Sequence, residues 1–375
     1  MNRLVSRIAV AALLLLPAVS EADPLLSFGP DVPMFITVAA SVRRENNVFL
    51  SSQDQQADTI YVLVPGINLQ WTGGKSSLGI ALSEQFSRYS TNRELDDHLL
   101  NFASNLAYKG ANSSLGLAAS YQQDDQTSLS IQSSDQTVKH SLADVTANGE
   151  MQVGGKTSIG VGVQFDRTIY PEVGYIDTDV WNFPVNVYYA VTPKTDLSLG
   201  YQNTRTRLAT GTGNSEDNFY NVGARGQFTA KLSGQVRVGV TDHKPEVGAK
   251  SSDLGLSANV DYVATPKTTF DLAAGSGYST SPLGTGEKVF SMGLTGRSQL
   301  SEAWLATLGA TYDSTNYLST LGRVDGFWVA NIGLSYIWTS TTNFEVDYVY
   351  RKNSSNVAAD AFNDNVLTFT VASRF

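Results

Sequence analysis

The segment Leu367-Thr-Phe-Thr-Val-Ala-Ser-Arg-Phe375 alternates in character from one residue to the next. Its apolar face holds Leu367, Phe369, Val371 and Phe375, with Ser373 as a polar interruption. Side chains of a strand point alternately to its two faces, so this rhythm predicts a strand with one apolar side. A terminal segment usually frays unless it is held in place. We therefore expect the strand 363–375 to pair with another strand, and the segment 34–44 is the expected partner.

The first residues have a different pattern. Arg3 and Arg7 precede the apolar run 8–16, which is followed by Pro17 and mostly small residues to Ala22. This is typical of a secretory signal peptide, and the run is too short to cross a bilayer core of about 30 Å. We predict a signal peptide over 1–22 (with cleavage after Ser20 as the alternative), a periplasmic segment over 23–33 and a barrel over 34–375.

Composition excludes several classes of protein. The 375-residue chain has no cysteine, which excludes a disulfide scaffold, a thiolate metal site and a lipid-modified N-terminal cysteine. Its formal net charge of −9 makes an exported chain a poor binder of nucleic acid, so no nucleic-acid partner is expected. The chain also carries 17 Tyr, 16 Phe and 5 Trp, an aromatic content that needs apolar surroundings.

The two-residue rhythm recurs along almost the whole chain. It predicts strands over 34–44, 59–71, 76–89, 97–108, 114–122, 137–151, 156–169, 177–190, 195–207, 217–230, 233–243, 252–263, 268–279, 286–299, 302–313, 324–338, 341–352 and 363–375. Short turns and longer polar loops alternate strictly between them, which is typical of outer-membrane barrels. The predicted fold is all-β: a single transmembrane antiparallel up-and-down β-barrel of about 18 strands, with both termini periplasmic. Near Pro65-Gly66 the apolar pattern slips by one residue, which suggests a β-bulge.

The predicted strands separate an apolar face from a polar one. In 177–190 the apolar set is Trp181, Phe183, Val185, Val187 and Tyr189. Aromatic residues also gather near both ends of the strands, as in the interfacial girdles of membrane barrels. One group is Trp71, Tyr108, Tyr189, Tyr262, Trp304 and Trp338, and the other is Phe86, Trp181, Phe219, Tyr278, Tyr312 and Trp328. A soluble sandwich, the alternative fold, does not explain these girdles.

The polar face is the candidate functional surface. By alternation we expect the lumen to be lined by Asp166, Asp196, Arg225, Arg237, Asp261, Asp271, Arg297, Glu345, Asp347 and Arg351, along with Arg374 and many amides. Eighteen strands enclose a lumen wide enough for water unless something folds into it. Such a lining suits a hydrated sugar polymer or a non-specific aqueous pore, and a third possibility is that the side chains pair and plug the barrel.

Catalytic patterns are missing from the sequence. His98, His140 and His243 are far apart along the chain, and no nucleophile elbow, His-Glu-x-x-His or phosphate loop is present. We therefore predict a protein that is not an enzyme and has no catalytic residues, cofactor or resident metal. Asp124-Asp125 and Asp360 with Asp364 could bind calcium, although solvated acidic loops explain them as well.

Several segments resemble a β-barrel porin 2-like family of outer-membrane barrels. The resemblance involves Arg44-Glu-Asn-Asn-Val-Phe49, Thr59-Ile-Tyr-Val-Leu-Val-Pro-Gly-Ile67, the step from Tyr89 through Asn92 to His98, and the two Thr-Pro-Lys-Thr turns. Members of this family are often encoded with exopolysaccharide or capsule synthesis machinery. Phe375 resembles the C-terminal signal that the outer-membrane barrel assembly machinery recognises.

The resemblance implies a passive conduit that exports an exopolysaccharide or capsular polysaccharide across the outer membrane. Its expected partners are outer-membrane lipid, the assembly machinery, the polysaccharide cargo and periplasmic polysaccharide-export proteins. The alternative function is a general or sugar-selective diffusion porin, which predicts a constricting loop inside the barrel. None of the nine loops is clearly longer or more apolar than the rest, and this disfavours that alternative.

Overall fold

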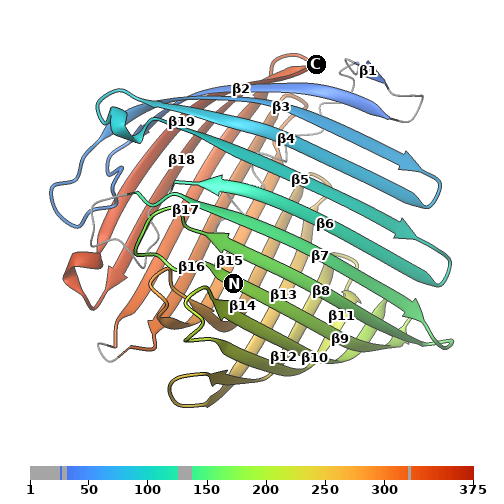
Figure 1. The fold of residues 1–375 in the computed structure, drawn as a ribbon. Helices are drawn as coiled ribbons and strands as arrows, with labels where there is room; N and C mark the ends of the chain where they lie inside the picture. Colours follow the sequence, from blue (N-terminus) through green and yellow to red (C-terminus); the bar gives the residue numbers. More distant parts are fainter. Residues whose placement is uncertain (1–25, 28–31, 126–136, 320–321) are drawn as a thin grey trace.

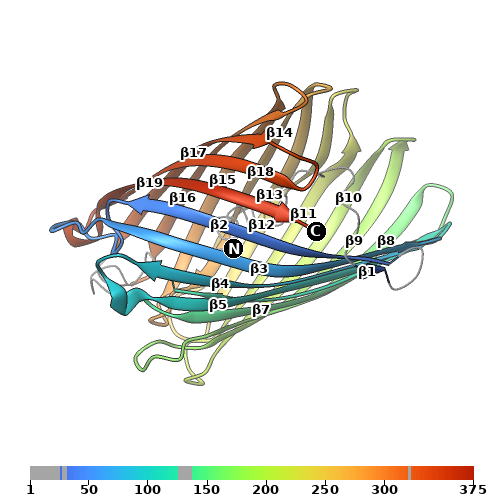
Figure 2. The same cartoon turned by 90° about the horizontal axis from the view of Figure 1, so that it is seen from above.

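The computed structural model describes residues 26–27, 32–125, 137–319 and 322–375, and the predicted signal peptide lies outside them. In the described part of the chain, strands β2 to β19 form one closed antiparallel barrel (Figures 1 and 2), as predicted. The strands are β1 (Leu26–Ser27), β2 (Pro33–Glu45), β3 (Asp58–Gly73), β4 (Ser76–Tyr89), β5 (Asp97–Lys109), β6 (Ser113–Asp124), β7 (His140–Gln152), β8 (Thr157–Ile169), β9 (Thr178–Thr192), β10 (Thr195–Leu208), β11 (Ser215–Gln227), β12 (Leu232–Pro245), β13 (Ser251–Thr265), β14 (Thr268–Thr280), β15 (Gly286–Gln299), β16 (Trp304–Tyr317), β17 (Val324–Ile337), β18 (Thr342–Ser355) and β19 (Phe362–Arg374). Two short 3₁₀ turns, η1 (Arg93–Leu95) and η3 (Ala358–Asp360), lie between strands. No helix among the described residues is long and apolar enough to cross a membrane.

The last strand closes the barrel against the first long one. β19 pairs with β2 from Val366 opposite Glu45 to Arg374 opposite Thr37. Phe375 and Ile36 exchange two backbone hydrogen bonds of 2.8 Å. Figure 1 shows the red β19 beside the blue β2. The pairing expected from the terminal alternation is confirmed, and neither strand is left with an unpaired edge.

The outer surface of the barrel is apolar. Trp181, Phe183, Val185, Val187 and Tyr189 of β9 are all exposed, whereas Asn186 and Tyr188 between them are buried. On other strands the exposed fraction reaches 67% for Leu199, 73% for Leu254 and 62% for Ile332. Hydrophobic side chains this exposed, in a continuous belt, suit a lipid environment and not water.

The short turns use one local design several times. The backbone N–H of Lys194, Lys231 and Lys267 donates to the hydroxyl of the threonine two residues earlier, each over 3.2 Å. A hydroxyl that satisfies a turn N–H in this way stabilises a tight connection between antiparallel strands. The near-copies Thr192-Pro-Lys-Thr195 and Thr265-Pro-Lys-Thr268 therefore mark equivalent turns at the same end of the barrel, here named the turn end, and the longer loops lie at the other, the loop end (Figure 1).

The predicted bulge at Pro65-Gly66 is absent. β3 keeps a single register with β2 through Pro65 and Gly66, and its ladder with β4 resumes in the same register after a short gap. Tyr61, Leu63 and Ile67 share the exposed face, whereas Val64 is buried on the inner one. The apolar pattern slips because apolar residues occupy both faces here, and the section below describes what covers the inner face.

One predicted girdle residue faces the wrong way. Tyr220 of β11 is exposed on the outer surface, so its neighbour Phe219 points inward. The Phe219 ring lies against Gly255 of β13, where a side chain at position 255 would collide with it. Phe219 therefore packs over a glycine inside the barrel and does not belong to the outer aromatic belt.

Candidate functional site

The contacts of Arg225 identify the inner face of the barrel. Its guanidinium donates two hydrogen bonds of 2.6 Å to the carboxylate of Glu150. Arg225 lies on β11 and Glu150 on β7, and three strands separate them in the wall. Side chains from such distant strands can meet only across the interior. The polar face of the sheet, which alternates with the exposed apolar residues, is therefore the inner face.

Further contacts build a compact group around this arginine, which we name the Arg225 cluster: Glu150, Tyr188, Asp196, Arg225 and Arg237. Arg225 Nε donates to Asp196 over 2.9 Å, and its Cζ lies 3.3 Å from the centre of the Tyr188 ring. Arg237 Nη2 donates to the Tyr188 hydroxyl over 3.3 Å. The cluster thus ties β7, β9, β10, β11 and β12 together through a largely neutralised set of charges.

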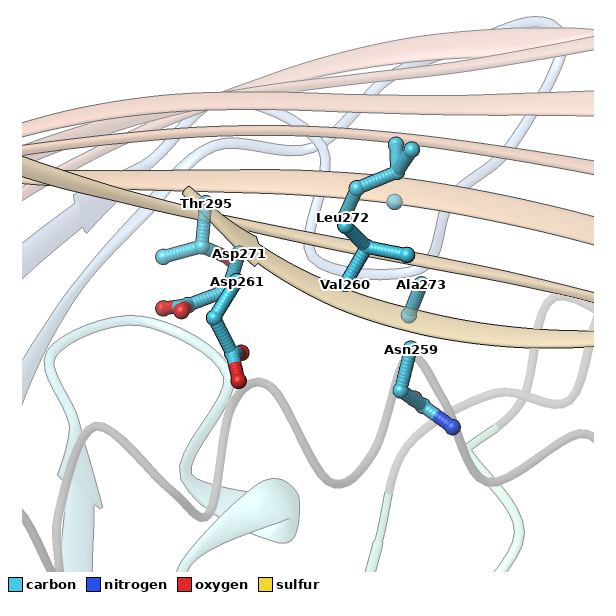
Figure 3. Close-up of a pocket in the computed structure, with 8 residues that line it drawn as sticks. Asn259, Val260, Asp261, Asp271, Leu272, Ala273 and Thr295 are labelled. Carbon is cyan, nitrogen blue, oxygen red and sulfur yellow. The ribbon is translucent and has the colours of Figure 1, made fainter. Parts of the chain in front are cut away.

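Two carboxylates lie side by side on β13 and β14, the strands that follow β12 in the wall. Asp261 and Asp271 are directly opposite each other in the ladder, and Thr295 of β15 is opposite Asp271. Figure 3 shows both carboxylates on the same side of the sheet, with Leu272 pointing away from them. With Asn259 they line a hollow of about 180 Å³. Arg297 of β15 is the basic group that acts on Asp271.

A second carboxylate pair lies on β18. Glu345 and Asp347 are two residues apart, so they share the inner face, and their side chains interact with each other. The Asp347 carboxylate lies against Gly333 of the neighbouring strand, where a β-carbon would leave it no room. We name Asp261, Asp271, Glu345 and Asp347 the turn-half carboxylates, because all four lie in the half of the barrel nearer the short turns.

Other polar side chains lie flat against the wall. Asn186 and Asn221 flank Gly200 of β10, and the carboxamide oxygen of each would be 2.5 Å from a β-carbon at that position. On β7 and β8, Gln164 Nε2 donates to Asp144 over 2.8 Å and to Asp166 over 3.0 Å. Amides that lie over glycine make the lining thin, which leaves more of the cross-section to water.

At the loop end, the loop of residues 46–57 folds inward. Leu50 is buried against Phe327 of β17 and Phe362 of β19, both of them buried inner-face residues. Val48 packs on Ile60 and Tyr89 at the start of β3 and the end of β4. Asn47 is fully buried, and its amide donates to the backbone oxygens of Ser51 and Asn363. We name residues 46–57 the inward loop, because its apolar side chains rest on the inner wall.

Two further loops meet over the same mouth. The backbone N–H of Ile176, between β8 and β9, donates to the oxygen of Pro282, between β14 and β15, over 2.8 Å. Five strands separate β9 from β15 in the wall, so this contact crosses part of the opening. Burial raises the pKa of Tyr170 beside these loops, and the carboxylates of Glu287 and Asp177 raise it further. The loop-end mouth is therefore narrowed from two sides.

Carboxylates at the loop end mostly have arginine partners. Arg351 is 3.1 Å from both Glu45 and Asp364, and Arg323 contacts Asp325 at 2.5 Å and Asp360 at 3.0 Å. Burial alone would lower the pKa of Arg323, but its hydrogen bonds to Asp325 and the charges of Tyr317, Asp325 and Asp360 together outweigh burial and raise it. Burial raises the pKa of Asp360, and Arg323 opposes that shift. These ion pairs hold the ends of β2, β17, β18 and β19 together beneath the inward loop.

The ten charged residues predicted for the lumen fall into separate groups. The structure brings Asp196, Arg225 and Arg237 together, groups Asp261 and Asp271 with Arg297, and pairs Glu345 with Asp347. Asp166 contacts Gln164, and Arg351 belongs to the ion pairs of the loop end. The prediction missed Glu150, Asp144 and Asp313, which share this face. Their alternation was readable in the sequence, although it could not show that Glu150 meets Arg225.

Metal and catalytic chemistry find little support in the described residues. His243 is buried 2.5 Å from Asp217 and stacks on Tyr278, and His98 lies 3.2 Å from Glu84 at the surface. Among the described residues no group of three or more His, Asp or Glu side chains could hold a metal ion. Asp360 and Asp364, suggested as calcium ligands, each face an arginine instead.

Comparison with known proteins places the chain in a family. The profile of the family described as "Putative beta-barrel porin 2" matches residues 34–375. The chain belongs to this family. A β-barrel porin is an outer-membrane channel, which agrees with the barrel and its apolar belt. The family description does not mention exopolysaccharide.

Solved structures show the same fold at low sequence identity. OccK2 (OpdF) of Pseudomonas aeruginosa is 11% identical, with a TM-score of 0.50 over 93% of this chain and 99% of that one. A BenF-like porin from Pseudomonas fluorescens Pf-5 is 10% identical, with a TM-score of 0.50 over 93% of this chain and 100% of that one. OpdK of Pseudomonas aeruginosa with vanillate is 10% identical, with a TM-score of 0.49 over 91% of this chain and 99% of that one. A search of curated proteins finds no match.

Proposed function

We propose that this porin is a passive diffusion channel for small hydrophilic solutes. The observation that carries the proposal is the inward loop, whose Leu50 rests on Phe327 and Phe362 inside the barrel. A loop packed on the inner wall limits the size of what passes, while the polar lining below it keeps the lumen hydrated. A constricting loop inside the barrel is what the alternative function, a diffusion porin, predicts from the sequence.

The expected polysaccharide conduit stays a prediction. A polymer needs an unobstructed opening at both ends, and loops reach over the loop-end mouth from two sides. The narrowing therefore favours small solutes over a polymer chain. Periplasmic polysaccharide-export proteins likewise stay predicted partners.

The orientation in the membrane is part of the proposal. Short turns on the periplasmic side and longer loops outside are the rule for outer-membrane barrels. This arrangement puts both termini in the periplasm, consistent with export by the predicted signal peptide over residues 1–22. Phe375, half-exposed at the turn end, is then positioned for recognition by the barrel assembly machinery.

The test is conductance and solute uptake by the refolded mature barrel. In planar bilayers we expect discrete channels, and in liposomes we expect swelling with monosaccharides but not with long dextrans. Replacing residues 48–55 by a short glycine-serine link should raise the conductance about twofold, because the constriction is removed. The matched control removes the exposed residues 247–249 of the loop between β12 and β13 and should change nothing.

Three outcomes separate the functions. Barrels that fold but neither conduct nor swell liposomes contradict the diffusion porin. Passage of long dextrans through the unmodified barrel supports the polymer conduit instead. Equal conductance before and after removal of residues 48–55 contradicts the role assigned to the inward loop.

A further inference from the structure

The inner face of the barrel carries more carboxylates than arginines. Among the ten predicted lumen residues six are acids and four are arginines. Of the residues not predicted, Asp144, Glu150 and Asp313 add acids to this face, and Arg43, opposite the buried Ile60, adds an arginine. An aqueous lumen with low-dielectric walls concentrates the field of such charges on whatever passes through it. The charge of the lining therefore bears on which solutes this porin admits, an inference that rests on the proposed diffusion function.

Two of the interior arginines, Arg225 and Arg351, are neutralised by carboxylates, whereas none of the ion pairs found within the described residues includes Arg237 or Arg297. Arg225 donates to both Glu150 and Asp196, and the three contacts measure 2.6 to 2.9 Å. Arg351 is similarly held between Glu45 and Asp364. An arginine already hydrogen-bonded to two carboxylates offers little positive potential to a passing anion. Those carboxylates in turn offer little negative potential to a cation.

The turn-half carboxylates differ in this respect. Asp261 faces Asp271, and Glu345 interacts with Asp347, so each acid has another acid as its near neighbour. None of the ion pairs found within the described residues includes any of the four. Arg297 acts on Asp271, but one arginine does not balance four carboxylates, which leaves an excess of negative charge around the lumen on β13, β14 and β18.

Neighbouring carboxylates repel one another, and a mobile cation between or near them relieves that repulsion. Rings of Asp and Glu side chains select cations in channels for the same reason. An anion that approaches the same wall meets net repulsion, because the carboxylates outnumber Arg297. The hollow of about 180 Å³ beside Asp261 and Asp271 is large enough for a hydrated cation to bind transiently.

We propose that this porin selects cationic and neutral solutes over anionic ones, and that Asp261, Asp271, Glu345 and Asp347 determine this selectivity. The loop end limits the size of the solute, and the turn half of the lumen selects its charge. The chemical class of substrate is thus a small, hydrated molecule with a positive charge or none, and small carboxylates and phosphates are disfavoured.

The experiment measures the reversal potential of the reconstituted mature barrel in a KCl gradient from about 0.1 M to about 1 M. We expect the sign of a cation-selective channel, with potassium permeability above chloride permeability. The combined variant Asp261→Asn, Asp271→Asn, Glu345→Gln and Asp347→Asn should lower the permeability ratio about threefold while channels stay open. Glu84→Gln is the matched control, because Glu84 pairs with His98 on the outer surface, and it should leave the ratio unchanged.

The outcomes distinguish this inference from the function on which it rests. Folded barrels without any conductance overturn both. Channels of the unmodified protein that favour chloride, or show no preference, overturn the selectivity and leave the diffusion porin standing. If the combined variant fails to fold, the reversal potential of the unmodified protein still tests the charge selectivity. Its preference for potassium should weaken when both solutions approach 1 M salt, because the screening length falls to about 3 Å.

Discussion

The two ends of the barrel interior use the same residue types in different ways. At the loop end, carboxylates sit in ion pairs with Arg323 and Arg351, and apolar side chains of the inward loop cover part of the wall. In the turn half no loop intrudes among the described residues, and four carboxylates stand in pairs without a salt bridge. The loop end therefore limits the size of the solute, and the turn half selects its charge. Mutations at one end should change one property without the other.

The largest expected effect comes from unseating the inward loop with Leu50→Asp. The charge cannot stay between Phe327 and Phe362, and the lost packing should cost about 2 to 3 kcal/mol of unfolding free energy. Single-channel conductance should rise about twofold, with the permeability ratio unchanged. The control is Leu283→Asp, since Leu283 is 52% exposed in the loop between β14 and β15. A changed ratio would show that size and charge are not separable in this way.

A smaller effect is expected from Arg225→Ala in the turn half. It leaves Glu150 and Asp196 without their shared partner, and we expect a loss of about 2 kcal/mol, reduced because the Arg225 side chain is 26% exposed. Denaturant unfolding of the detergent-solubilised barrel measures the loss. Cation selectivity should increase at the same time, because two carboxylates become available to solutes. Arg297→Ala should cost under about 1 kcal/mol, because none of the ion pairs within the described residues includes Arg297.

Sequence reasoning was sufficient for the fold, for a physical reason. Strand alternation is local, so the outward set of Trp181, Phe183 and Val185 could be read directly, and closure followed from the need to pair Phe375 in lipid. The same rule located Asp196 and Arg225 on one face. It could not show that Arg225 meets Glu150, because that contact joins residues 75 positions apart across the interior of the barrel.

The inward loop was not predicted, although the sequence of β3 contains a pattern that indicates it. Loop length and loop hydrophobicity gave no signal, because only Val48 and Leu50 of the loop core need to be apolar. The pattern that indicates the loop is instead in the strand that the loop covers. Ile60, Val62 and Val64 are apolar on the inner face of β3, and the slip between Val62 with Val64 and Ile67 with Leu69 suggested a bulge. An inner-face apolar run in a barrel strand predicts a loop that covers it.

The loop end should also respond to pH through Asp125. Burial, together with the charges of Asp124 and Asp97, raises the pKa of Asp125 to about 6 against the opposing charge of Arg43. Because the folded pKa lies above the ordinary value, the charged form is disfavoured in the fold. This group's contribution to stability therefore falls as pH rises from about 4 to about 6 and is constant above.

The variant Asp125→Asn tests this titration. It should be more stable than the parent by about 1 to 2 kcal/mol at pH 7.5 and by much less at about pH 4.5. Thermal unfolding followed at several pH values measures the difference. An equal difference at both pH values would mean that Asp125 does not titrate in this range. The permeability ratio should not follow the same profile, because charge selection is assigned to the other half of the lumen.

The smallest effect is expected at the rim of the turn end, where each of six successive turns exposes one lysine: Lys75, Lys109, Lys156, Lys194, Lys231 and Lys267. These side chains lie in solvent outside the lumen, so salt screens them within about 8 to 10 Å under physiological conditions. Replacing all six by glutamine should leave stability within about 1 kcal/mol and raise the preference for potassium only slightly. The reversal potential at low and at high salt measures it. If this variant changed the permeability ratio as much as neutralising the turn-half carboxylates does, the rim and not the interior would select the charge of the solute. The assignment of charge selection to the turn half of the lumen would then be wrong.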